Sequence, residues 1–186
     1  MNTHRTATTR RAATLLLAGI AGAAWAQAPA PLSSPIPGAP ALPSGSGLGV
    51  HSPNSPFAPL PARSDVVPWS VLGDVSTRIE DKRVLPVFKA AQTALHQKVQ
   101  RVQGFMMPLE PGERQRHFLL SSVPLTCGFC VPGGPESMVE VKTRTPVKYT
   151  MDPVVVEGRV AILPDDPFGL YYRVADAAGV GLLGGG

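Results

Sequence analysis

The stretch VEGRVAI, residues 156–162, alternates apolar and polar side chains with a period of two. Because successive side chains of a β-strand point to opposite faces, this pattern predicts a strand with one apolar face. The same alternation occurs in LYYRVAD at 170–176 and in SMVEVKT at 137–143. Two further apolar segments, VQRVQGFMM at 99–107 and RHFLLSSV at 116–123, bring the expected number of short strands to five.

Glycine lies inside two of these segments, at Gly104 and Gly158. A glycine within a strand lets the strand coil sharply at the corner of a barrel. Ahead of the strands, LPVFKAAQTALHQ at 85–97 has apolar residues at helical spacing, with Pro86 tolerable in the first turn. We therefore expect a mainly β domain, a small five-stranded, partly open OB-like barrel of antiparallel strands with one N-terminal helix. The alternative is a curled antiparallel sheet capped by that helix.

The first residues have the pattern of a secretory signal peptide. Arginines precede an apolar run at 12–24, and Ala24-Trp25-Ala26 supplies a small-x-small cleavage site. The run is shorter than the roughly 20 apolar residues that a membrane anchor needs. We expect a signal peptide at 1–26, a periplasmic location and no membrane span in the mature chain. Both the general secretory and the twin-arginine route fit the residues before the run.

Composition divides the rest of the chain into three parts. Residues 27–66 are dominated by Pro, Ala, Ser and Gly, which bury too little apolar surface to offset the entropy of ordering. We expect a disordered linker there, one OB-like β domain at 67–179 and a flexible tail at 180–186.

The charge balance argues against nucleic acid as a partner. The expected signal peptide holds three of the 17 basic residues and none of the 13 acidic ones, which leaves 14 basic against 13 acidic residues. No basic stripe with interleaved aromatic residues follows, so we expect no nucleic-acid binding.

The segment at 86–141 resembles the uncharacterised exported bacterial proteins grouped as "domain of unknown function 3299". The residues that carry the resemblance are Gly-Phe-Met-Met-Pro-Leu at 104–109 and Phe-Leu-Leu at 118–120, and the likeness extends over about 69–175. The resemblance implies a periplasmic, OB-like, non-enzymatic domain, linked in some members with transport systems. In the common form a histidine takes the place of Cys130, which favours a soft-metal ligand over a redox couple in the family at large.

Cys127 and Cys130 are the only cysteines of the chain, and three interpretations of the pair stay open. A thioredoxin-like redox couple needs a helix after the second cysteine, and Val-Pro-Gly-Gly-Pro at 131–135 cannot begin a long helix. A disulfide suits an oxidising compartment, although closing a four-residue ring stabilises by only about 2 kcal/mol. Two thiolates on a tight turn also suit half of a zinc site or a linear Cu(I) site.

The metal interpretation needs ligands from outside the turn. The expected domain offers His96 and His117, of which His117 is our candidate third ligand beside Cys127 and Cys130, with zinc or copper as the metal. Thioethers at Met106, Met107 and Met138 could serve Cu(I), although methionines in apolar strands are more often core residues.

No residue pattern in the sequence indicates a catalytic site, so we expect that the protein is not an enzyme. Glu136-Ser137 and Asp165-Asp166 lie in expected turns, where such residues cap or face solvent, and Ser121-Ser122 lacks a glycine-framed elbow. We expect a periplasmic binding or accessory module, with the turn at 127–130 exposed at the barrel rim and transport components or exported proteins as partners. The alternatives are a thiol-disulfide protein acting on exported clients and a purely structural interaction domain with a turn disulfide.

Overall fold

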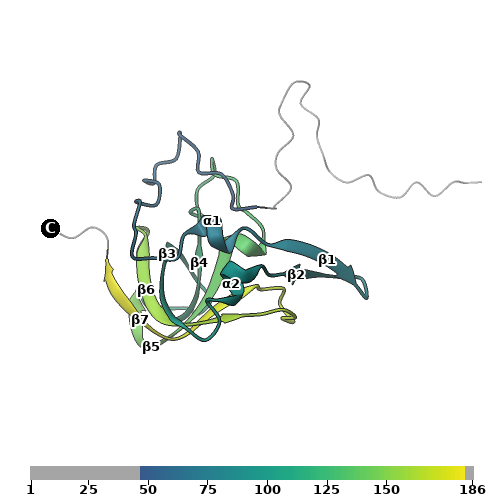
Figure 1. Ribbon diagram of the computed structural model, residues 1–186. Helices are drawn as coiled ribbons and strands as arrows, with labels where there is room; N and C mark the ends of the chain where they lie inside the picture. The colour runs from purple at the N-terminus through teal and green to yellow at the C-terminus, as the bar shows by residue number, and fades with distance from the viewer. Residues whose placement is uncertain (1–46, 183–186) are drawn as a thin grey trace, which may run out of the picture. The chain divides into compact units, whose positions relative to one another are not determined.

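The computed structural model describes residues 47–182, and most of these form a closed five-stranded barrel. The strands follow one another around the barrel in the order β3-β4-β5-β7-β6, with β6 pairing back to β3 (Figure 1). Their bounds are Val99–Pro108 for β3, Arg114–Ser121 for β4, Met138–Lys148 for β5, Val154–Ile162 for β6 and Tyr172–Leu182 for β7. The mainly β, OB-like fold and its five strands are confirmed.

The barrel differs from the expectation in two respects: it is closed, and β5 pairs with β7 in parallel. The other four strand pairs are antiparallel. Five strands cannot alternate in direction all the way around a ring, because five is an odd number. Closure therefore requires at least one parallel pair, and β5–β7 supplies it.

The apolar faces of the strands meet inside the barrel. Phe118, Leu120, Val141 and Tyr172 are fully buried there, and each such side chain contributes about 1.5–3 kcal/mol by its burial. Gly158 lies at a close approach of two strands, because a Cβ atom there would lie 2.7 Å from Cγ1 of Val174 and 2.8 Å from the oxygen of Ala175. Only glycine lets β6 approach β7 this closely.

The expected helix at 85–97 is wrong for most of its length. The chain instead forms strand β2, Arg83–Val87, which pairs with β1, Ser76–Glu80, and then a single helical turn α2, Ala90–Thr93. The residue before a proline is pushed out of the helical region, so Leu85 ahead of Pro86 favours extended backbone. The spacing did identify residues that pack, since Phe88 lies against the barrel with its ring centroid 5.7 Å from that of Tyr172.

Residues 47–66, which we expected to belong to the linker, lie on the barrel. Val50 forms a β-bridge with Val131, and Val66 is buried ahead of the short helix α1, Trp69–Leu72. At the other end, β7 extends through Leu182, into the segment expected to be a tail. The expected signal peptide at 1–26, the linker residues 27–46 and residues 183–186 lie outside the described residues.

The helices of the described residues are too short to span a bilayer. None within 47–182 combines the length and the apolar character that a membrane crossing requires.

Candidate functional site

The loop between β4 and β5 carries the two cysteines, and a disulfide joins them. Their Cα atoms are 5.3 Å apart. The turn is built by successive backbone hydrogen bonds, in which Cys127 N–H donates to Pro124 O at 3.2 Å and Cys130 N–H donates to Cys127 O at 3.2 Å. The Pro-Gly-Gly-Pro run that follows leads only into the 3-10 turn η1, Pro135–Ser137, so no α-helix begins directly after Cys130.

The turn at 127–130, which we expected to be exposed, is exposed at its tip, but its two cysteines are buried. Cys127 is 6% exposed and Cys130 is 9% exposed, whereas the side chain of Phe129 between them is 65% exposed. Neither cysteine belongs to the cluster that fills the barrel. The loop therefore has a small interior of its own, with an aromatic ring on the outside.

The N-terminal segment at 47–55 fastens the turn to the domain. Val50 and Val131 exchange two backbone hydrogen bonds of 2.8 and 2.9 Å, and Gly134 N–H donates to Gly47 O at 3.0 Å. Ser55 Oγ lies 3.3 Å from Sγ of Cys127, and its hydroxyl is the donor because a disulfide sulfur carries no hydrogen. Contacts from a segment distant in sequence thus cover the disulfide.

Glycine makes this contact possible. A Cβ atom on Gly133 would lie 2.2 Å from Gly47 O, and one on Gly49 would lie 2.7 Å from Val131 O. Gly49 also has a positive φ of 77°, which other residues adopt only with strain. The glycines in the loop and in the expected linker therefore allow the two backbones to meet.

His117 is not near the cysteines but belongs to an ion-pair network on the outside of the barrel. Its Nε2 lies 2.7 Å from Oε1 of Glu140, which also pairs with Arg173 and, at 3.4 Å, with Lys142. Burial alone would raise the pKa of Glu140, but hydrogen bonds from Arg173 and His117 outweigh it and lower this pKa. Glu140 is 5% exposed, so it is a buried carboxylate with its charge fully paired.

The structure does not bring the three expected metal ligands together. Cys127 and Cys130 are bonded to each other, and His117 contacts Glu140. Among residues 47–182, no three His, Cys, Asp or Glu side chains group closely enough to hold a metal ion. His96 accepts a hydrogen bond from the backbone of Ile162 at 3.2 Å.

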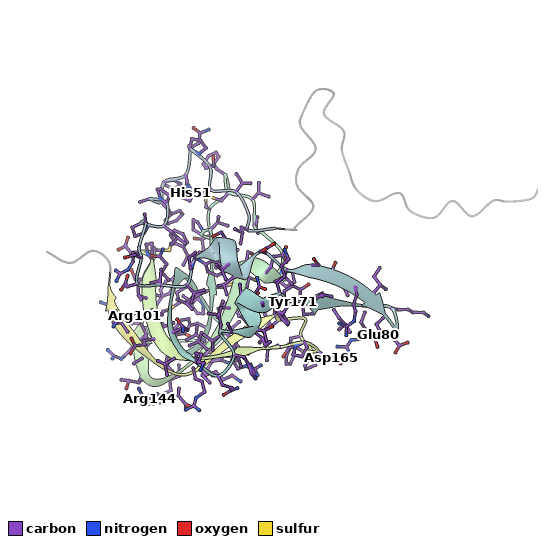
Figure 2. The ribbon with its side chains drawn as sticks, in the orientation of Figure 1. His51, Glu80, Arg101, Arg144, Asp165 and Tyr171 are labelled. Carbon is purple, nitrogen blue, oxygen red and sulfur yellow. A yellow bond between two sulfur atoms is a disulfide. The ribbon has the colours of Figure 1, made fainter. Side chains whose placement is uncertain are left out.

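His51 lies near the turn, although it belongs to the segment that we expected to be a linker. It follows Val50, whose pairing with Val131 places the segment beside the disulfide, and Figure 2 shows it in this loop region. Its Nε2 is buried and has no hydrogen-bond partner among the described residues. No local signal identified it, because the residues around it have the composition of a linker.

The remaining polar candidates have structural partners. Asp166 accepts backbone hydrogen bonds from Phe168 at 2.9 Å and Leu170 at 3.3 Å, so it caps the turn between β6 and β7. Asp165 pairs with Arg83. The buried hydroxyl of Ser121 donates to Val123 O at 2.7 Å. These contacts assign the residues to turns and strand ends, and they indicate neither a reaction nor its absence.

Comparison with known proteins identifies the family. The model of the DUF3299 family, described as a protein of unknown function, matches residues 73–167. The chain belongs to this family. A crystal structure of a DUF3299 family protein from Pseudomonas aeruginosa PAO1 is similar at 20% identity and a TM-score of 0.38, and the match covers 73% of this chain and 93% of that chain. No curated protein matches the chain.

Membership of the DUF3299 family brings no described activity. The matched region begins just ahead of the β1–β2 hairpin and ends in the turn before β7, so it includes the disulfide-bonded turn. The recognition of the family from the residues at 104–109 and 118–120 is confirmed.

Proposed function

We propose that this chain is an exported, non-enzymatic binding module that uses the disulfide-closed turn to bind a protein partner. The observation that carries the proposal is Phe129, an aromatic side chain 65% exposed at the tip of a turn whose two sulfurs are buried. Aromatic residues contribute disproportionately to protein interfaces, because a large apolar ring with few rotatable bonds can fill a pocket.

Rigidity supports this assignment. The turn holding Phe129 is closed by a covalent bond and secured by the Val50–Val131 bridge. Binding then costs less entropy, because a loop already held in its bound shape has little freedom left to lose. A transport component or another exported protein is the class of partner that we propose, with the periplasm as the place of binding.

The buried disulfide makes metal and thiol chemistry weaker proposals. A soft metal binds thiolates, and neither sulfur is a thiolate while Cys127 and Cys130 are bonded. Zinc or copper binding is therefore a proposal for the reduced form only. Thiol-disulfide exchange with an exported client needs a thiolate to reach a sulfur, and exposures of 6% and 9% restrict that access.

Photo-crosslinking in living cells tests the proposal. A photoreactive phenylalanine analogue replaces Phe129 in one strain and Phe168 in another, since Phe168 is a second loop phenylalanine and is 85% exposed. We expect position 129 to give a discrete crosslinked protein that position 168 does not give. The product should weaken when Cys127 and Cys130 are both replaced by serine, because the turn then loses its closure.

Indistinguishable crosslinks from the two positions would remove the basis of the proposal. Mass spectrometry of the product identifies the partner and shows whether it belongs to a transport system. The N-terminal residue of the purified protein checks export, for which cleavage before Gln27 is the expected result.

A further inference from the structure

The hairpin of β1 and β2 is a separate two-stranded sheet beside the barrel. All five side chains of β1 are exposed. The hairpin extends away from the barrel in Figure 1, and Figure 2 shows Glu80 near its tip. A two-stranded hairpin is marginally stable on its own in water, and in this one only Leu85 and Pro86 of β2 are buried. A further strand beside β1 would therefore stabilise it.

The outer edge of β1 can form main-chain hydrogen bonds. Asp81 and Lys82 form a two-residue turn. In such a hairpin the flanking residues, here Glu80 and Arg83, hydrogen-bond to each other through their main chains. Hydrogen-bonded pairs alternate with non-bonded ones, so the N–H and C=O groups of Ile79 point away from β2. Outside the regular ladders of the described chain, no backbone hydrogen bond involves Ile79.

The two faces of the hairpin differ in chemistry. Ile79 lies directly opposite Val84, and these side chains are 80% and 58% exposed. Arg78 and Glu80 lie on the other face, where Nε of Arg78 is 3.0 Å from Oε2 of Glu80. The edge therefore combines one exposed apolar pair with one cation and one anion.

This edge is complementary to itself. If two β1 strands lie antiparallel with Ile79 opposite Ile79, then Arg78 of each copy lies opposite Glu80 of the other. The two isoleucines would exchange a pair of main-chain hydrogen bonds, because both direct their polar groups outward. We propose that two copies of this chain associate through β1, forming a four-stranded sheet β2-β1-β1-β2 with a two-fold axis at Ile79.

A second copy of this chain is the partner that fits the β1 edge, because Arg78 of each copy faces Glu80 of the other. A two-fold axis brings the same patch of both subunits together, so the patch must be complementary to itself. The Arg-Ile-Glu order of residues 78–80 meets that condition, whereas two cations at these positions would repel. The sheet would also align Val84 and Ile79 of both copies in one apolar row.

The contact is small, so association is weak. Two paired five-residue strands bury less than the roughly 1,200 Å² typical of a stable interface. We expect a dissociation constant on the order of 0.1–1 mM. The surface is separate from Phe129, so this inference does not depend on the proposed function.

Sedimentation equilibrium measures the self-association of the protein expressed from the full chain. Variants that reverse the charge at position 78 or 80 test the proposal. Arg78→Glu places two glutamates on the edge and Glu80→Arg places two arginines on it. Each single variant should self-associate about tenfold more weakly than the parent, because like charges then face each other. An equimolar mixture of the two should associate as the parent does, and so should the double variant Arg78→Glu/Glu80→Arg.

A control separates the edge from general surface changes. Ile79→Ser should weaken association, whereas Val99→Ser, at a side chain 64% exposed on the barrel, should leave it unchanged. The proposal fails if the parent protein is monomeric at millimolar concentration. It also fails if the protein associates but the mixture of the two charge variants does not recover that association.

Discussion

Removing the disulfide should loosen one face of the domain without unfolding the barrel. The ring closed by Cys127 and Cys130 has a sequence separation of three, so four residues enter the loop-entropy relation. That relation gives about 2 kcal/mol at 25 °C. The barrel core contains neither cysteine, so we expect the double variant Cys127→Ser/Cys130→Ser to be folded and about 2 kcal/mol less stable.

Urea unfolding of the parent and the double variant measures this difference. Hydrogen exchange then shows where the loss is located. The amides of Val50 and Val131 should exchange faster in the variant, because their mutual hydrogen bonds fasten the loop that the disulfide closes. The amide of Val156, buried in the barrel, should change only as far as global stability changes.

A reducing agent supplies an independent version of the experiment. Reduction of the parent should reproduce the effect, and the same agent should leave the double variant unchanged. A loss above about 4 kcal/mol would refute the loop-entropy reasoning, because so short a ring cannot account for it. Unchanged exchange at Val50 and Val131 would refute the assigned role of the turn.

Three further predictions concern the barrel and its ion pairs. Gly158→Ala should cost about 1–3 kcal/mol in urea unfolding, whereas Gly128→Ala should cost far less, because a Cβ atom there has nothing within 4 Å. Tyr172→Phe should cost about 1–3 kcal/mol in the same assay, since the Tyr172 hydroxyl donates to Leu72 O at 2.6 Å and its loss leaves a buried acceptor unpaired. The pKa of Glu140 is lower in the folded chain than its ordinary value, so its contribution is fully present above about pH 4.3 and is lost as the pH falls through the folded pKa. The urea midpoint of the parent should therefore fall more steeply below about pH 4 than that of Glu140→Gln.

His117, our candidate metal ligand, instead contacts the carboxylate of Glu140 on the outside of the barrel. A histidine at a strand position offers an imidazole to whichever neighbour the sheet places beside it. Here β5 places Glu140 within reach and β7 adds Arg173. Cross-strand register, which no single segment encodes, therefore decided the role of His117.

The cysteine pair shows how far local reasoning reaches. Two cysteines three positions apart on a Pro/Gly turn can form a disulfide in an oxidising compartment, and that possibility was clear from the residues. The burial of both sulfurs was not, because the covering residues come from 47–55, a segment whose composition predicts disorder. Burial depends on which distant segment lies over a site, and composition does not report that.

The sequence by itself determined the five barrel strands of this protein, because an alternation of period two is a local property of each segment; it did not reveal β1 or β2, which pair beside the barrel. It also determined the family, through the residues at 104–109 and 118–120. Only the tertiary structure decided the closure of the barrel, the parallel β5–β7 pair and the cover over the disulfide. Each of these joins segments far apart in the chain, and their free energy appears only when the whole domain has assembled.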